Sequence, residues 1–453
     1  MKKVEVKSVE TIKIPDDNNI WDVIVVGGGP AGMMTAGRAA ECGARVLLIE
    51  KNDTLGRKLL ITGGGRCNVT NAQQDVRKFL EKYTDNAKFL FSTFSQWDVE
   101  KTLNFFYLRE MPTKVENEGR VFPVSDSAQS VWNTLVEYMR AGGVTVLSDS
   151  SVTEIVREST KDKNTEKSGN GKVSEILVGV KIKSGKNSGE VVRGRSIVIA
   201  TGGTSRPETG STGDGYAWLK KIGHTIVEPT PSLVPIVVKD KWISRVAGVG
   251  LKDAKITTFQ NNKKQEVSRG KILFTHVGLS GPTILNMSRD IGELLKYGEV
   301  AVSLDLLPDF DHGQLNKKLQ EIFKENTNKK FRNSLGSLVP SALATVLVEL
   351  SLIGEDTPCN SVTREERLKL IDLLKGLRLN VDKLLGLEKA IVTSGGVVLS
   401  EVDFKTMQSR LFPNLYLVGD ILNIDRPSGG YSLQLCWTTG FVAGTDSATK
   451  SKA

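Results

Sequence analysis

A glycine-rich turn near the start of the chain carries the first chemical signal. Gly27, Gly29 and Gly32 fit the pattern G-x-G-x-x-G. They follow an apolar run at 22–26, typical of a buried parallel strand, and they open a segment of small residues that predicts a helix. Backbone N–H groups at such a helix start can face a pyrophosphate. The turn therefore predicts a dinucleotide-binding site.

An acidic residue ends the next apolar run. Residues 45–49 predict a second strand, and Glu50 follows 18 residues after Gly32. A carboxylate at this place accepts hydrogen bonds from the hydroxyls of the adenosine ribose. The strands and the helix between them predict a Rossmann-like βαβ unit, and hence an α/β fold.

Two further turns favour FAD over NAD(P)H as the bound cofactor. The apolar run at 415–418 ends in Gly419 and Asp420, and a second apolar run at 196–200 leads into the turn at 201–203. In FAD enzymes of this fold, an aspartate like Asp420 binds the ribityl chain or the pyrophosphate. The chain has no second G-x-G-x-x-G turn, so we expect NAD(P)H only as a transient electron donor.

A third motif combines three consecutive glycines with positive charge. The glycines at 63–65 have no packing value and a cost in backbone entropy, so they suit a backbone that lies against a flat ring or a phosphate. Arg57, Lys58 and Arg66 surround them in the sequence. Their charge would stabilise a pyrophosphate or an anionic reduced flavin.

The composition sets the class of protein. The chain has 453 residues, of which 39% are hydrophobic and 25% charged, as expected for a globular protein of two or three domains. Its four cysteines are far apart and form no C-x-x-C pair, and its three histidines have no neighbouring ligands, so we expect no metal. Two lysines near the N-terminus precede no apolar segment, and we expect a cytoplasmic protein without a signal peptide.

The pattern along the chain predicts one discontinuous domain with an insert. Residues 1–20 form a polar arm, and 21–227 with 388–453 form the FAD-binding domain. The insert at 228–387 is strand-rich over 228–305 and helical over 306–387.

The motifs together resemble a family of bacterial NAD(P)/FAD-dependent oxidoreductases known as aminoacetone-oxidase-like, BaiN-like or YhiN-like flavoproteins, which are related to ribosomal RNA dihydrouridine synthases. The resemblance covers nearly the whole chain after residue 20. It rests on GRKLLITGGGRCNVTN, ATGG, STGDG, FTHVGLSGP, TSGGV and GGYSLQ, where the family usually has Asn in place of Ser432. It implies a flavoprotein with two dinucleotide-binding domains, whose FAD domain carries a β-barrel-like and helical insert.

From the turns and the resemblance we expect the cofactor-binding residues to lie in five segments of the chain. They are Gly27, Gly29, Pro30, Ala31, Gly32; Glu50, Lys51, Arg57, Lys58, Thr62, Gly63, Gly64, Gly65, Arg66, Asn68; Val152; Ala200, Thr201, Gly202, Gly203; and Gly419, Asp420, Gly430, Tyr431, Ser432.

Three side chains are candidates for a catalytic proton donor. Cys67 lies on the glycine loop, Tyr431 precedes the last predicted helix, and His276 lies in the insert. A positioned acid of this kind would protonate the substrate carbon after hydride arrives from the flavin. Each side chain could instead have a purely structural role.

The resemblance implies three chemistries: reduction of uracil in ribosomal RNA to dihydrouridine, reduction of a conjugated C=C bond in a 3-oxo steroid or bile acid, and oxidation of a small amine such as aminoacetone. The net charge of +9 and two basic clusters in the insert favour RNA as a partner, although solvated surfaces would explain them as well. A non-catalytic, FAD-holding RNA-binding factor is a further alternative. The candidate RNA contacts are Lys252, Lys255, Lys263, Lys264, Arg269, Lys271, Lys329, Lys330 and Arg332.

Overall fold

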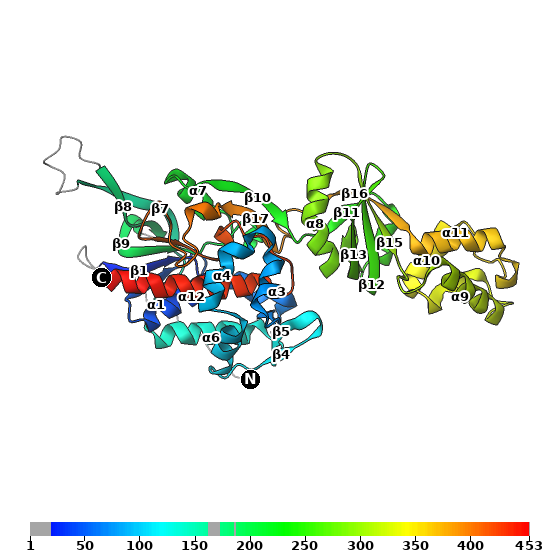
Figure 1. Ribbon diagram of the computed structural model, residues 1–453, viewed down its shortest axis with the longest axis horizontal. Coiled ribbons are helices and arrows are strands. Elements are labelled where there is room, and N and C mark those ends of the chain that lie inside the picture. The colour runs from blue at the N-terminus through cyan, green and yellow to red at the C-terminus, as the bar shows by residue number, and fades with distance from the viewer. Residues whose placement is uncertain (1–19, 162–172, 185–186, 453) are drawn as a thin grey trace. The chain divides into compact units, whose positions relative to one another are not determined.

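The computed structural model describes residues 20–161, 173–184 and 187–452 (Figure 1). The chain divides into two compact units. Unit 1 comprises Met1–Thr230 and Val392–Ala453, and unit 2 comprises Pro231–Ile391. Apart from Ile20, the expected N-terminal arm lies outside the described residues.

Unit 1 is built on a parallel sheet. The neighbouring strands of this sheet run parallel to one another, and the side chains of its central strands are almost all buried. Burial on both faces explains the unbroken apolar runs in the sequence. The strand order is β6 (Thr145–Leu147), β2 (Val46–Ile49), β1 (Trp21–Val26), β9 (Asn187–Ile199) and β18 (Leu415–Leu417).

One long strand joins this parallel sheet to an antiparallel one. Residues 194–199 of β9 pair with β1, whereas 187–193 pair in antiparallel fashion with β8 (Val173–Ser184). Strand β8 in turn pairs with β7 (Ser151–Lys161). The chain thus reaches the central sheet directly from a three-stranded antiparallel extension.

Helices position the loops at the carboxyl ends of the parallel strands. Helix α1 (Pro30–Glu41) packs against both α6 (Ala128–Ala141) and α12 (Tyr431–Lys452). In Figure 1, α12 (red) runs beside α1 (blue). The other helices and strands of unit 1 are α2 (Arg57–Ile61), β3 (Thr70–Asn71), α3 (Val76–Leu80), α4 (Ala87–Gln96), α5 (Val99–Tyr107), β4 (Thr113–Val115), β5 (Arg120–Pro123), α7 (Asp214–Lys221) and β17 (Val392–Val397). Strand β10 (Ile226–Ser232) begins in unit 1 and ends in unit 2.

Unit 2 contains a closed antiparallel barrel and a helical part. Around the barrel the strands are β11 (Ile236–Val238), β14 (Gly278–Ser280), β13 (Lys263–Phe274), β12 (Gly250–Gln260), β15 (Val300–Asp305) and β16 (Leu377–Leu384). The helices are α8 (Pro282–Leu295), α9 (His312–Glu325), α10 (Ser341–Ser351) and α11 (Arg364–Lys375).

The expectation of a purely helical segment at 306–387 is wrong for its last part. Residues 377–384 form β16, which closes the barrel between β15 and β11. The buried side chains Leu377, Leu379 and Val381 alternate with exposed ones. This two-residue period is typical of a strand. It was overlooked because the leucines just before it have helical spacing.

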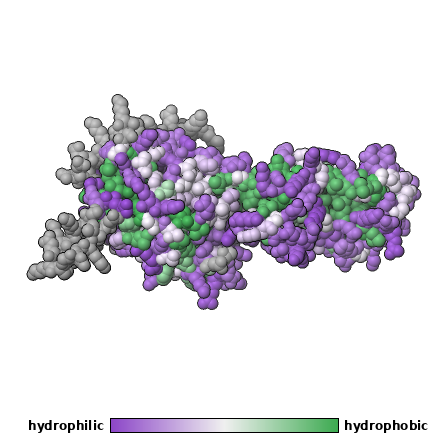
Figure 2. Space-filling view, turned by 90° about the horizontal axis from the view of Figure 1, so that it is seen from above, coloured by the Kyte–Doolittle hydropathy of each residue, from purple (hydrophilic) through white to green (hydrophobic). Residues whose placement is uncertain are grey.

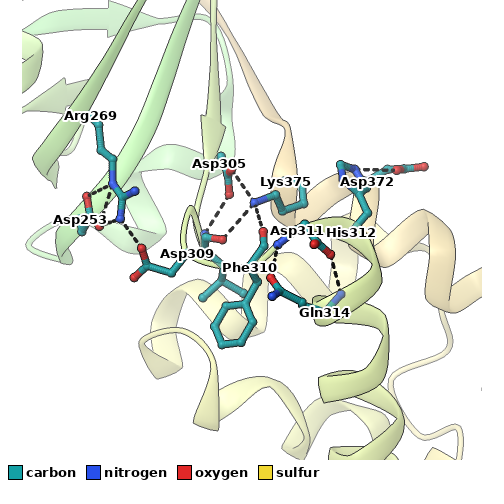
Figure 3. Close-up of polar contacts among 11 residues, drawn as sticks. Asp253, Arg269, Asp305, Asp309, Phe310, Asp311, His312, Gln314, Asp372 and Lys375 are labelled. Atoms are coloured by element: carbon teal, nitrogen blue, oxygen red, sulfur yellow. Dashed lines mark hydrogen bonds and ion pairs between the residues drawn. The ribbon is translucent and has the colours of Figure 1, made fainter.

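A largely buried lysine fixes the helical part to the barrel (Figure 3). The ammonium group of Lys375, at the end of α11, lies 2.6 Å from a carboxylate oxygen of Asp305 at the end of β15. It also donates hydrogen bonds to the carbonyls of Leu307, at 3.0 Å, and Phe310, at 2.5 Å. Both charged side chains are almost buried, so this pair orders the junction between the barrel and the helices.

Candidate active site

The predicted nucleotide-binding turn lies between β1 and α1. Gly27 donates to the carbonyl of Ile49 at 2.8 Å, and a Cβ atom on Gly32 would lie 1.9 Å from the carbonyl oxygen of Gly27. Only glycine fits at position 32. By contrast, a Cβ atom on Gly29 would meet nothing within 4 Å. The backbone at Gly29, just before Pro30 and Ala31 at the helix start, is therefore open to a ligand.

Glu50 lies directly beneath this turn. Its Oε2 atom accepts a hydrogen bond from the backbone N–H of Gly28 at 2.7 Å. Its Oε1 atom accepts two from Asn52, from the backbone N–H at 2.9 Å and from the side-chain amide at 2.7 Å. A carboxylate offers about four acceptor positions, so one position on Oε2 remains for a ribose hydroxyl.

The residues after Glu50 join the site to neighbouring segments. Ser150 donates its backbone N–H to the carbonyl of Glu50 at 3.0 Å, which brings the start of β7, with the buried Val152, next to Glu50. Lys51 forms an ion pair with Asp214, at the start of α7, at 2.8 Å. The charge of Lys51 is thus partly compensated by the protein itself.

The turn that follows β9 lies against β17. Ala200 is buried, and the backbone N–H groups of Thr204 and Ser205 donate to the hydroxyl of Thr393 at 2.8 and 3.0 Å. A Cβ atom on Gly203 would lie 2.3 Å from that same hydroxyl, and Gly202 has a φ angle of +73°. The buried hydroxyls of Thr201 and Thr204 have no hydrogen-bond partner among the described residues. Buried hydroxyls without partners suit a turn that a polar ligand completes.

Lys58, Asp420 and Arg426 form a charged cluster. The ammonium group of Lys58 lies 3.6 Å from a carboxylate oxygen of Asp420 and donates to the hydroxyl of Ser205 at 2.6 Å. Arg426 forms an ion pair with the other carboxylate oxygen of Asp420. Burial alone would raise the pKa of Asp420, but Arg426 and Lys58 hold that pKa below its ordinary value. Burial lowers the pKa of Lys58, and Asp420 partly opposes this shift.

The glycine loop is open, but two of the cations expected beside it are bound to carboxylates. Gly63, Gly64 and Gly65 are exposed, and nothing lies within 4 Å of a Cβ atom on Gly64. Arg57 pairs with Asp53 at 2.6 Å, and its side chain is partly exposed.

Arg66 has three protein partners. It forms ion pairs with Glu116 and Asp126, and its guanidinium lies 4.1 Å from the ring centroid of Phe122. The hydrogen bond from Arg66 lowers the pKa of Glu116. These partners were not predictable from the local sequence because all three lie at least 50 residues further along the chain. Arg66 therefore anchors one end of the glycine loop.

The remaining side chains of the loop bind backbone groups of the protein. The hydroxyl of Thr62 donates to the carbonyl of Leu59 at 2.7 Å, and the side-chain oxygen of Asn68 accepts from the backbone N–H of Val121 at 3.2 Å. Cys67 has no exposed surface, and its backbone has a φ angle of +60°. Burial raises the pKa of its thiol to about 12.

The segment before α12 brings Tyr431 and Ser432 to the same region. A Cβ atom on Gly430 would lie 2.3 Å from the backbone of Thr70, which follows the glycine loop, and the backbone of Gly419 has a φ angle of +70°. The ring of Tyr431 packs 4.8 Å from that of Phe79, centroid to centroid. Its hydroxyl has no hydrogen-bond partner within the described parts of the chain, and burial raises its pKa.

The structure therefore brings the cofactor-binding residues expected around Glu50, Lys58, Thr201 and Asp420 into unit 1, near the carboxyl ends of β1, β2, β9 and β18. His276 belongs to unit 2, where it is exposed just before β14. Arg426 was not expected. It lies six residues after Asp420 and directly after Asp425, and no pattern in this stretch marked it as a site residue.

The residues present fit a bound FAD. The open backbone at Gly29 and Gly64, the free acceptor position on Glu50 and the unpartnered hydroxyl of Thr201 offer contacts of the required kinds. No group of three potential metal ligands is found among the described residues. In that same part of the chain, no helix has the length and apolar character needed to span a bilayer.

Comparisons with known proteins agree with this architecture. Residues 21–446 match the model of the HI0933-like protein Rossmann domain family. The chain is 30% identical to a 3-dehydro-bile acid delta(4,6)-reductase of Clostridium scindens, and 30% identical to a ribosomal RNA dihydrouridine synthase of Escherichia coli. Each alignment covers 94% of this chain and 98% of the relative.

Solved structures share the fold at low sequence identity. The 3-ketosteroid delta1-dehydrogenase of Sterolibacterium denitrificans superposes with a TM-score of 0.53 at 13% identity, over 95% of this chain and all of that one. A flavocytochrome c3 fumarate reductase superposes with a TM-score of 0.52 at 16% identity, over 96% of this chain and 79% of that one. The family match over nearly the whole chain, and the fit of the site to FAD, lead to one conclusion: the protein belongs to the HI0933-like family and is an FAD-dependent oxidoreductase.

Proposed function

We propose that the protein reduces an activated C=C bond, and that its substrate is uracil in RNA. FAD supplies the hydride for such a reduction when it is bound, and NAD(P)H is the proposed source of electrons. Both full-length relatives support a reductive role, since one is named a bile-acid reductase and the other a dihydrouridine synthase.

The chain's part in the chemistry is to hold a proton for the second carbon of the alkene. Burial raises the pKa of both Cys67 and Tyr431, so both stay protonated at neutral pH, as a general acid must. Cys67 has no exposed surface, whereas Tyr431 is 7% exposed and its hydroxyl has no partner among the described residues. We therefore favour Tyr431 as the donor over Cys67.

The observation that carries the choice of RNA is a set of exposed lysines on the hairpin of β12 and β13. None of them has an ion pair among the described residues, so their charge is available to phosphates. Hydrophilic residues cover much of the face of unit 2 that Figure 2 shows, with smaller hydrophobic patches between them. The lysines are Lys252, Lys255, Lys263, Lys264 and Lys271.

Other cationic side chains of the insert offer less charge to RNA phosphates. Figure 3 shows Arg269 between Asp253 and Asp309, both of which it contacts, so its charge is compensated. Lys330 pairs with Asp356 at 3.0 Å, and Arg332 contacts the same carboxylate at 3.2 Å. Lys329 is exposed and belongs with the available lysines. The proposed RNA-binding surface is thus narrower than the two basic clusters of the sequence.

The binding part of the proposal is tested by the salt dependence of RNA affinity. Each phosphate contact contributes about −0.7 to the slope of log K against log salt for single strands. Removing three contacts should flatten the slope by about 2. The variant is Lys255→Gln/Lys264→Gln/Lys271→Gln, and its control is Lys296→Gln/Lys318→Gln/Lys369→Gln, in which each lysine pairs with a carboxylate three or four residues away along the chain. Equal slopes for wild type and variant would show that the hairpin does not bind RNA.

A small enone is the second candidate substrate, favoured by the similarity to the bile-acid reductase. The two candidate substrates are distinguished by incubating the purified, FAD-loaded protein and NADPH or NADH with ribosomal RNA or with a 3-oxo-Δ4 steroid. Dihydrouridine among the digested nucleosides supports the first candidate. A reduced steroid, with RNA unchanged, would replace it by the second.

A further inference from the structure

Two residues predicted to bind FAD, Asp420 and Ser432, contact the same arginine. Arg426 lies in the loop before α12, and its guanidinium contacts the carboxylate of Asp420. Its Nε atom donates to the hydroxyl of Ser432 at 3.1 Å, and its Nη1 atom donates to the carbonyl of Ile424 at 2.6 Å. Lys58 lies on the other side of Asp420, at 3.6 Å. Segments near residues 420 and 432 thus converge on Arg426, whose side chain has no exposed surface, and the segment near residue 58 contacts Asp420.

The contacts require an arginine. A planar guanidinium presents several N–H donors in fixed directions, whereas an ammonium group is a single point of charge. Arg426 uses all three of its nitrogens, each on a different partner. A lysine could hold Asp420 but could not also hold Ser432 and the carbonyl of Ile424.

The cluster carries an excess of positive charge. With Lys58 protonated, Lys58 and Arg426 contribute two positive charges and Asp420 one negative charge, which leaves one positive charge. Lys58 is 22% exposed and Asp420 14% exposed, so water screens them only in part. An uncompensated charge in such surroundings attracts an anionic ligand more strongly than it would in water.

We propose that Arg426 is a positioning residue of the flavin site, which holds Asp420 and Ser432 in place, and that its charge favours the reduced, negatively charged form of the flavin. The proposal rests on FAD binding in unit 1 and not on the identity of the substrate. Electrostatic stabilisation of the reduced form raises the midpoint potential of the bound flavin. Loss of a positive charge should therefore lower that potential and weaken FAD binding.

The two roles are separable with a pair of variants. Arg426→Met reduces the charge of the cluster from +1 to 0. Arg426→Met/Asp420→Asn returns the charge to +1 but removes the carboxylate that Arg426 positions. If charge sets the potential, the double variant should recover the wild-type potential. If Asp420 itself binds FAD, the double variant should not recover the affinity.

The experiment measures the dissociation constant of FAD and the two-electron midpoint potential of the holoprotein. For Arg426→Met we expect at least tenfold weaker FAD binding and a tenfold weaker preference for the reduced form, equal to about 30 mV. Arg426→Lys should keep the potential and lose several-fold in affinity. The control is Arg140→Met, because Arg140 is exposed in α6 and pairs with Glu137.

Two outcomes would overturn the proposal. Arg426→Met with the affinity and potential of wild type would show that Arg426 has no role toward the flavin. A double variant with a potential as low as that of Arg426→Met would refute the charge argument. If Arg426→Met does not fold, Asp420→Asn replaces it: this change raises the charge of the cluster from +1 to +2 and should raise the midpoint potential, and an unchanged or lower potential would refute the charge argument. Neither measurement involves RNA or a steroid, so failure of the proposed substrate leaves this test intact.

Discussion

The hydrogen bonds of Glu50 allow the effect of one substitution to be worked out. In the wild type, one carboxylate oxygen accepts from Gly28 and the other from Asn52. The amide of Glu50→Gln has a single acceptor oxygen and turns an NH₂ group toward one of these backbone donors. A buried donor left without an acceptor costs about 1–3 kcal/mol. We expect a loss of about 2 kcal/mol, which lowers the Tm of unit 1 by roughly 5 °C.

The same substitution should weaken FAD binding. It removes the acceptor position of Glu50 that we assign to a ribose hydroxyl, and a hydrogen bond to a charged group contributes about 1.5–3 kcal/mol, or roughly ten- to a hundredfold in Kd. Thermal unfolding without FAD and fluorescence titration with FAD measure the two effects. Glu137→Gln, at an exposed position in α6, serves as the control. A Glu50→Gln protein with the Tm and Kd of wild type would refute this reading of the turn.

Two further predictions concern stability. Burial lowers the pKa of His224 although Glu401 opposes the shift, so the folded protein binds fewer protons than the unfolded chain, and its stability should fall as pH drops below about 6.5. In denaturant titrations between pH 7 and 5, His224→Gln should therefore lose less stability than the wild type. An equal loss of stability in the two proteins would contradict this prediction. Lys375→Met leaves the largely buried Asp305 without its partner and should lower the free energy of unfolding in urea by roughly 3 kcal/mol. The control Lys369→Met, at an exposed position of the same helix, should lower it by less than about 0.5 kcal/mol. Similar losses for the two variants would show that the Lys375 pair does not order the junction.

The parts of the fold that depend on short-range patterns were predictable from the sequence. The turn at Gly27–Gly32 and the carboxylate at Glu50 belong to one βαβ unit, so their spacing along the chain determines their proximity. The predictions of a Rossmann-like FAD domain and of a barrel in the insert are confirmed. Residues 377–384 were misread because a leucine-rich helix precedes them directly.

The charge balance of the site was not predictable in this way. Arg57 and Arg66 looked available for a phosphate, but Asp53, Glu116 and Asp126 bind them. The partners of Arg66 lie on other elements, and nothing in the local sequence indicates them. The assignment of individual residues to FAD or to proton transfer stays a prediction.

The most direct test of the proposed reaction is the dihydrouridine content of ribosomal RNA from cells with and without the gene, measured by mass spectrometry of digested nucleosides. We predict that one dihydrouridine disappears on deletion and returns with the wild-type gene but not with Glu50→Gln or Asp420→Asn. Unchanged dihydrouridine in the deleted strain would contradict RNA as the substrate and would leave an FAD-dependent reductase of small molecules.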